Sequence, residues 1–170
     1  MAETRGGRRQ SSHVGRDNLG IVITGDGAHV HIGDREGPSQ HLSNGKRHLQ
    51  NHLYAQAIEE FNQAIKAGPE NAELYYLSAV ATLEGGKAFL APLARIRKCE
   101  TLIHCALRLE SRGVFYYFLA YLAADYYERK SLRAPVSARS LLEQAWALGV
   151  TSAEIEQLFS MLIVENTLPI

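Results

Sequence analysis

Histidine and cysteine side chains are the groups in this sequence most able to hold a metal or to act as a base or nucleophile. The chain contains seven histidines and two cysteines. His29 and His31 alternate in a β-prone stretch, so they would share one strand face, where they either chelate a metal weakly or simply form a polar surface. His104 and Cys105 are neighbours in a predicted helix, and adjacent helical side chains point about 100° apart. We therefore predict no catalytic residue and no metal site.

The sequence contains no complete cofactor-binding motif either. Glycines recur between residues 20 and 33, but Val30 stands where dinucleotide binding requires the third glycine, and no helix follows. The lysine of a phosphate-binding loop is absent as well. Cys99 and Cys105 are six residues apart, roughly 120° away from a shared helix face, so we expect two reduced thiols. The sequence predicts a protein that has no cofactor and is not an enzyme.

The net charge and the length of the apolar runs argue against nucleic acid and membranes as partners. Eighteen basic and eighteen acidic residues cancel, so no overall field attracts nucleic acid or an anionic membrane. The longest apolar runs are too short to cross a bilayer. Arg5, Arg8 and Arg9 are followed by no apolar stretch, so the N-terminus does not have the pattern of a secretory signal. We expect a cytoplasmic protein with a protein partner, no nucleic acid and no membrane.

The first part of the chain divides into three short segments. Residues 1–18 are rich in Gly, Arg and Ser and are predicted to be a disordered tail, either solvated or in contact with an acidic partner through its arginines. Residues 19–33 are predicted to form a β-hairpin, because Asp26-Gly27 between two β-branched runs favours a two-residue turn. A polar linker, residues 34–38, then leads into a helical domain, residues 39–165.

One face of the predicted hairpin is apolar and needs a cover, because an isolated two-stranded hairpin is marginal in water. This β-contact face consists of Ile21, Ile23, Val30 and Ile32. Its cover is the chain's own helical domain, a partner, or a second copy of the chain; the alternative is that the segment stays disordered. The segment is β-prone, almost uncharged and free of proline, which favours cross-β stacking. It resembles the Gly-punctuated amyloid-signalling motifs of some bacterial and fungal nucleotide-oligomerisation receptors and their effectors, and the resemblance implies homo-oligomerisation.

The strongest helical signal is YAQAIEEFNQAIKAGPEN, residues 54–71. Ala57, Phe61 and Ala64 are spaced four and three apart and share one helical face, where small residues beside a large ring let a second helix approach closely. A Gly-Pro pair then ends the helix. This stretch resembles the second helix and closing turn of a tetratricopeptide repeat, a helix-turn-helix unit of 34 residues. The resemblance implies an all-α solenoid of about seven helices.

The same spacing marks two further units and one irregularity. It recurs in Cys99, Ile103 and Ala106 and again in Ala138, Leu142 and Ala145. In the first unit, Gly45 occupies the position of the small contact residue in the helix that precedes residues 54–67 and pairs with them. Eight extra residues around Pro92 predict an elongated or kinked helix, because proline starts or bends a helix.

The C-terminal part of the sequence predicts one more helix. Thr151 or Ser152 is the expected N-cap, with Glu154 in the first turn. A solenoid needs a terminal helix to cover its last apolar face. We therefore predict a capping helix that ends near residue 165, with Trp146 sealing the joint.

Tyrosines are concentrated in the helical domain, where all eight lie between Tyr54 and Tyr127. Tyrosine suits peptide binding because it supplies contact area with few rotatable bonds and a hydroxyl group. The resemblance implies that the first helix of each repeat lines a concave groove. The predicted partner-binding residues of that groove are Lys46, Tyr76, Val80, Tyr117, Tyr121 and Asp125. The alternative is that these rings only fill gaps between helices.

Two functions are consistent with these patterns. The first is a protein-interaction module or adaptor that binds a protein or peptide in the concave groove, with residues 20–33 as a second, β-type contact. The alternative is a small chaperone resembling the three-repeat chaperones of bacterial secretion systems, which cradle extended peptides in the same groove. Those chaperones lack a β-prone N-terminal segment, which this chain has.

Overall fold

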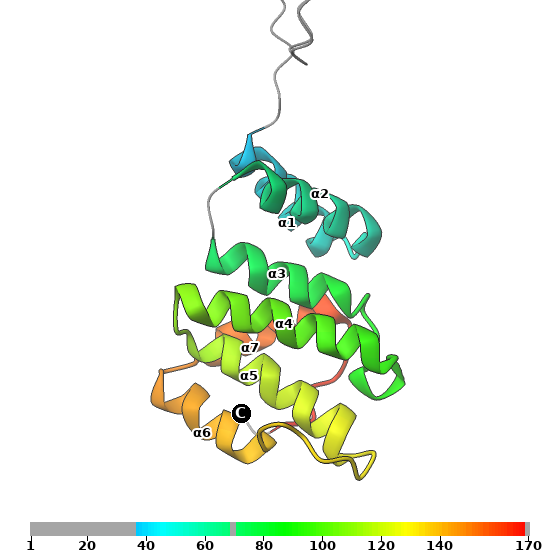
Figure 1. The fold of residues 1–170 in the computed structure, drawn as a ribbon, viewed down its shortest axis with the longest axis vertical. Helices are drawn as coiled ribbons and strands as arrows, with labels where there is room; N and C mark the ends of the chain where they lie inside the picture. Colours follow the sequence, from blue (N-terminus) through cyan, green and yellow to red (C-terminus); the bar gives the residue numbers. More distant parts are fainter. Residues whose placement is uncertain (1–36, 69–70, 169–170) are drawn as a thin grey trace, which may run out of the picture. The chain divides into compact units, whose positions relative to one another are not determined.

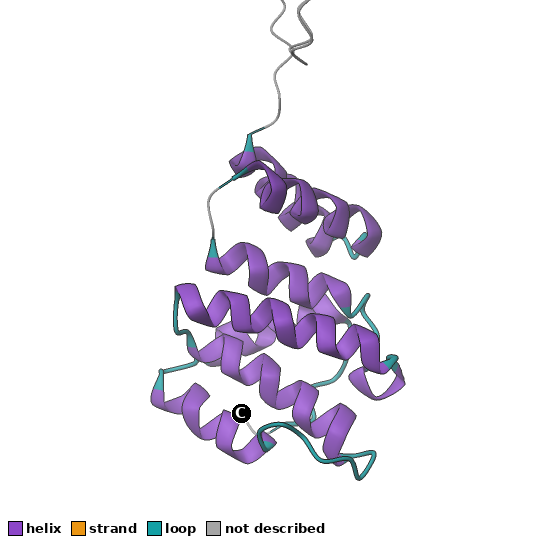
Figure 2. Ribbon diagram, viewed as in Figure 1, coloured by secondary structure: helices purple, strands orange, loops and turns teal. Residues whose placement is uncertain are grey.

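A computed structural model describes residues 37–68 and 71–168 of the chain. The predicted tail and hairpin, including Ile21, Ile23, Val30 and Ile32, lie outside the described residues, as does most of the predicted linker. The described part is all-α and contains no strand, as the sequence predicts for the helical domain (Figure 2). None of its helices has both the length and the apolar character that a membrane span requires.

Three consecutive helix pairs and a seventh helix make up the domain (Figure 1). The helices are α1 (Pro38–Gln50), α2 (Tyr54–Ala67), α3 (Ala72–Thr82), α4 (Leu93–Leu109), α5 (Gly113–Leu122), α6 (Ala138–Ala147) and α7 (Ser152–Leu162). Two short segments join them, the 3-10 helix η1 (Ala88–Leu90) and the π-helical turn η2 (Ala123–Glu128), which continues α5. The most extensive packing is within the pairs α1–α2, α3–α4 and α5–α6.

Small residues bring the helices of the first pair together, as predicted. Ala57, Phe61 and Ala64 of α2 are buried. The Phe61 ring lies against Gly45 of α1 so closely that a Cβ at this glycine would lie 2.4 Å from the ring atom Cε1. The absence of a side chain at Gly45 therefore sets how near α1 and α2 can approach.

The second pair also follows the predicted pattern. Asn71 caps α3, because its side-chain oxygen accepts hydrogen bonds from the backbone N–H groups of Glu73 and Leu74, at 2.8 and 3.3 Å. Cys99, Ile103 and Ala106 of α4 are fully buried. The Cys99 thiol donates a hydrogen bond to the backbone carbonyl of Ala79 on α3, at 3.4 Å.

The eight extra residues start a helix and do not kink one. Pro92 directly precedes α4, where a residue without a backbone N–H costs no helical hydrogen bond. With 17 residues, α4 is longer than its counterparts α2 and α6, with 14 and 10. The expected elongation of this helix is therefore confirmed, and η1 together with its flanking loops takes up the rest of the insertion.

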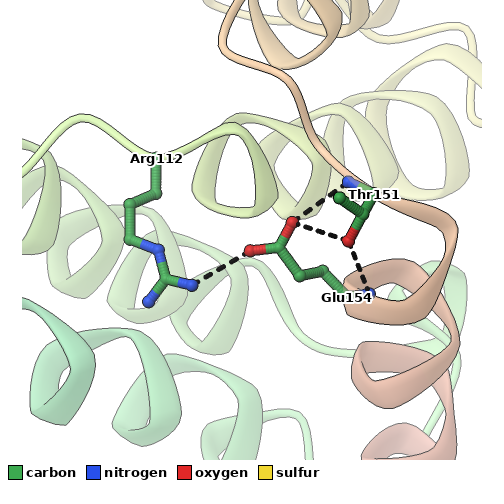
Figure 3. Close-up of polar contacts among 3 residues, drawn as sticks. All are labelled: Arg112, Thr151 and Glu154. Carbon is green, nitrogen blue, oxygen red and sulfur yellow. Dashed lines mark hydrogen bonds and ion pairs between the residues drawn. The ribbon is translucent and has the colours of Figure 1, made fainter.

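The last helix begins where the sequence predicts. Thr151 is the N-cap of α7, and Glu154 completes a capping box: the Glu154 backbone N–H donates to Thr151 Oγ1 at 3.3 Å, and the Thr151 backbone N–H donates to Glu154 Oε2 at 3.0 Å (Figure 3). Arg112, just before α5, donates to the other oxygen of Glu154, also at 3.0 Å. These contacts fix the start of α7 against the start of α5.

The position of α7 corrects the prediction of a terminal cap. This helix contacts α1, α3 and α5, the first helix of each pair, and so covers the side of the domain that these three helices form (Figure 1). We call this side the first-helix face. Trp146 does not seal a joint with α7, because 46% of its surface is exposed.

Candidate functional site

The predicted groove residues on the first-helix face are buried, and most are core residues. The exposed fraction is 7% for Tyr76, 0% for Val80 and Tyr117, 1% for Tyr121 and 6% for Asp125. None of these five side chains projects into an open groove. Tyr76, Tyr117 and Tyr121 instead fill gaps between helices, which is the alternative to the open groove.

Helix α7 covers Tyr117 and Tyr121. The Phe159 ring packs edge-to-face against Tyr117 and Tyr121, with ring centroids 6.4 and 5.3 Å apart. After the helix, the Asn166 side chain donates a hydrogen bond to the Tyr117 hydroxyl at 2.9 Å. At the other end of the face, the Tyr54 hydroxyl donates to the backbone carbonyl of Met161 at 2.8 Å. The chain's own C-terminal segment therefore occupies the surface that the resemblance assigns to a partner.

Tyr76 belongs to an aromatic cluster between α3 and α5. Its ring centroid lies 5.0 Å from that of Phe115 and 6.4 Å from that of Phe118. Burial raises the pKa of Tyr76 far above its ordinary value. The hydroxyl therefore stays protonated, and the residue acts in packing.

Asp125 holds the inserted segment against the end of α5. One carboxylate oxygen accepts a hydrogen bond from the backbone N–H of Phe89 at 2.8 Å, and the other pairs with Arg129 at 3.0 Å. The Tyr121 hydroxyl accepts from the backbone N–H of Ala88 at 3.3 Å. Burial, the largest cause, raises the pKa of Tyr121 to about 12. Both predicted groove residues thus secure η1, at a π-helical turn of the kind often found at functional positions.

Lys46 lies at the edge of the first-helix face and is the predicted groove residue that is most exposed. Its Nζ pairs with Glu73 of α3 at 2.8 Å, and about two fifths of each side chain is accessible to solvent. This pair links α1 to α3. Exposed pairs of this kind contribute little to stability, in the range of about 0–1 kcal/mol.

The composition of α3 and α5 indicates that the first-helix face is buried, which the repeat pattern alone does not indicate. In α3 every residue from Tyr76 to Thr82 is buried, and in α5 every residue from Tyr117 to Leu122 is buried. Both stretches are almost entirely apolar. A helix that is apolar all round is covered on every side. The composition of α3 and α5 therefore favours a buried first-helix face over an open groove.

An open hollow lies instead beside α4, and residues of α5, α6 and the loop before α6 also line it. It comprises two adjoining cavities of about 300 and 600 Å³ that share five lining residues. The shared residues are Thr101, His104, Leu119, Val136 and Leu141. We call this hollow the α4–α6 groove.

The α4–α6 groove has an apolar floor and a polar wall. Leu119 of α5 and Leu141 of α6 are buried at 6% exposure, and Val136 is 43% exposed on the loop before α6. The α4 wall presents four polar residues spaced four, three and four apart, so they share one face of the helix. These residues are Arg97, Thr101, His104 and Arg108, and all four are exposed.

Positive charge on this wall exceeds negative charge, because Arg97 and Arg108 share the wall with a single carboxylate, Glu100. Within residues 37–68 and 71–168, no carboxylate forms an ion pair with Arg97 or Arg108. Arg108 Nη2 lies 3.1 Å from Cys105 Sγ. Glu100 accepts a hydrogen bond from the Tyr127 hydroxyl at 3.2 Å. Burial, the largest cause, raises the pKa of this carboxyl, while the charges of His104 and Arg97 lower the pKa in part. The groove therefore offers two guanidinium groups that form no ion pair within the described residues, beside an apolar floor.

The Cys99 thiol lies in the core behind this groove and is not ionised. Burial raises the pKa of the Cys99 thiol to about 12, so it is protonated at neutral pH and behaves as a core residue. Among the described residues, no group of three or more His, Cys, Asp or Glu side chains is arranged to hold a metal ion. The arrangement of the α4–α6 groove suits binding of a segment with one apolar and one polar side.

This groove is not among the surfaces predicted from the sequence. The sequence feature that marks it is a stripe of polar residues at positions 97, 101, 104 and 108 of α4. The same helix also carries the buried residues Cys99, Ile103 and Ala106 in the four-then-three spacing.

The chain matches no family model, and no significant match was found among curated proteins or among solved structures.

Proposed function

We propose that this protein is a protein-interaction module, a tetratricopeptide-type domain of three repeats that binds a partner segment in the α4–α6 groove. The observation that carries the proposal is the open apolar floor beside an exposed polar wall, next to a first-helix face that is already filled. Apolar concavities with a few placed polar groups are the usual form of a binding site. The proposed role is binding and not catalysis.

Helix pairing supports the repeat interpretation. In each of the three pairs the second helix buries residues spaced four and three apart. In the first pair this spacing meets a glycine on the facing helix. Three units are about the minimum for a stable repeat domain.

The position of α7 favours an adaptor over a chaperone. A chaperone of the secretion type would cradle its client on the first-helix face, so α7 would first have to leave. Five apolar residues of α7 would then be exposed: Ile155, Leu158, Phe159, Met161 and Leu162, each at most 8% exposed in the structure. Uncovering even one such side chain costs roughly 1.5–3 kcal/mol. A partner that binds the α4–α6 groove avoids this cost.

The proposal is tested by site-specific photo-cross-linking. A photoreactive amino acid replaces Thr101 on the groove wall, and a matched variant carries it at Gln56, which is exposed on α2. In a lysate of the producing organism, the Thr101 variant is expected to capture a discrete protein that the Gln56 variant does not. Equal capture by both variants, or none by either, would contradict binding in the α4–α6 groove.

The segment 20–33 is the proposed second contact of the module. Its apolar residues Ile21, Ile23, Val30 and Ile32 favour β-type association between copies. Replacing Ile23 with Lys places a charge in that face, which opposes strand stacking. We expect the wild-type protein to form larger species as its concentration rises and the Ile23→Lys variant to stay monomeric in light scattering. A wild type that is monomeric at every concentration would refute this contact.

A further inference from the structure

We infer that the α4–α6 groove binds an acidic amphipathic helix of about three turns, supplied by a partner protein. The inference rests on the proposed function and names the chemistry of the partner. Three features of the groove carry it: its apolar floor, its length, and the sign of the charge on its wall.

The floor calls for apolar anchors on the partner. Leu119 and Leu141 lie at the base, and Val136 offers an exposed apolar side chain at the rim. A helix that docks in an apolar groove places residues i, i+3, i+4 and i+7 against such a floor. Its opposite side remains polar and faces solvent.

The length of the groove matches a short helix. Lining residues of α4 run from Arg97 to Arg108. At a rise of 1.5 Å per residue this wall is about 17 Å long, or about three helical turns. A helix of that length presents one set of i, i+3, i+4 and i+7 anchors.

The wall determines the charge of the partner. Arg97 and Arg108 stand at its two ends, and neither pairs with a carboxylate of the described residues. Glu100 is the one acidic residue among those that line the groove within the described chain; it accepts a hydrogen bond from the Tyr127 hydroxyl and offsets part of the Arg97 charge, so the wall keeps an excess of positive charge. Guanidinium groups bind carboxylates through paired hydrogen bonds. Glu or Asp residues beside the anchors therefore complement this wall.

A nucleic acid fits the same groove poorly. Backbone phosphates require an extended stripe of Lys and Arg, whereas this groove has two arginines and an apolar floor. The whole chain has no net charge. A protein segment accounts for both the apolar and the charged features.

The test measures binding of the full-length chain to three labelled helical peptides by fluorescence anisotropy. Each peptide is cross-linked in its helical form. The first has Leu at i, i+3, i+4 and i+7 with flanking Glu, the second replaces every Glu with Lys, and the third keeps the composition of the first but scatters the leucines around the helix. We expect the first peptide to bind about tenfold more tightly than the other two, and this preference to weaken as salt rises. A labelled duplex RNA serves as a fourth probe.

Charge reversal on the wall sharpens the test. The variant Arg97→Glu/Arg108→Glu is expected to invert the preference, so that the Lys peptide binds more tightly than the Glu peptide. The matched control is Arg47→Glu on α1, where the arginine is also exposed; it should keep the wild-type preference. Circular dichroism melts establish that both variants remain folded.

Several results would overturn the inference. Equal binding of the Glu and Lys peptides would refute the acidic partner, and equal binding of the scattered peptide would refute the amphipathic helix. Tighter binding of the RNA would favour a nucleic acid. If Thr101 cross-links a partner protein but no peptide shows a charge preference, the proposed function stands and the inference fails. If Thr101 captures nothing and no peptide binds, both fail.

Discussion

The two sides of the helical domain differ in what covers them. On the first-helix face, α7 packs Phe159 between Tyr117 and Tyr121, and the surface is part of the core. In the α4–α6 groove, apolar residues such as Val136 remain partly exposed beside arginines that form no ion pair within the described residues. The more apolar surface is therefore the one that the chain uses for its own folding. The less apolar surface, with charge at its edge, is the one that we propose binds a partner.

The largest expected effect comes from removing the side chain that fills the first-helix face. Phe159→Ala should destabilise the protein by about 3–5 kcal/mol, because it opens a cavity against two buried tyrosines. Denaturant unfolding followed by circular dichroism measures the loss. A loss below about 1 kcal/mol would mean that α7 is only loosely attached. The first-helix face would then be as open to a partner as the α4–α6 groove.

A somewhat smaller effect is expected where α1 meets α2. Gly45→Ala should destabilise the domain by about 1–3 kcal/mol, because the new Cβ would collide with the Phe61 ring. Ser43→Ala, an exposed change on the same helix, is the control for helix propensity and should be nearly neutral. Equal stability of the two variants in chemical denaturation would show that this pair of helices is loosely packed.

Acid should weaken the attachment of α7. Burial alone would raise the pKa of Glu154, but hydrogen bonds from Thr151 and Arg112 outweigh it and lower the pKa below its ordinary value of 4.5. A carboxylate whose folded-state pKa is lowered stabilises the fold above its unfolded pKa, and this contribution is lost as pH falls through the folded-state value. Glu154→Gln should therefore cost about 1 kcal/mol at pH 7 and progressively less as the pH falls below about 4.5.

A matched variant on the same helix tests the assignment to Glu154. Glu156→Gln changes an exposed residue two positions further along α7 and should leave stability nearly unchanged at neutral and at acid pH. Thermal melts at neutral and acid pH provide the comparison. A stability difference between wild type and Glu154→Gln that does not vary with pH would show that the carboxylate is not held by Thr151 and Arg112.

The smallest effect on stability is expected in the α4–α6 groove. Val136→Asp changes a side chain that is 43% exposed, so the free energy of unfolding should shift by no more than about 0.5 kcal/mol. Binding of the acidic helical peptide should nevertheless fall at least about fivefold, because the new carboxylate repels it and the apolar contact is lost. A large loss of stability with unchanged binding would show that Val136 acts in core packing and not in binding of the peptide.

The sequence by itself determined the local structure of the described domain. The four-then-three spacing of Ala57, Phe61 and Ala64 identified a buried stripe, and the structure confirms it. Pro92 marked the start of a helix, and the Thr151–Glu154 pair marked another. These features depend on backbone hydrogen bonds and on neighbours three or four residues away, so they can be recognised within a short segment.

Only the tertiary structure decided which surface receives α7, and with it which residues are buried and which remain exposed. The apolar stripe of α7 shows that the helix must be buried, but the same stripe fits the end of the domain or the first-helix face. The short turn between α6 and α7 is compatible with both, so sequence reasoning placed α7 at the end and Tyr117 and Tyr121 in an open groove. The choice depends on which site buries more apolar surface, a sum over α1, α3 and α5 that only the assembled helices define.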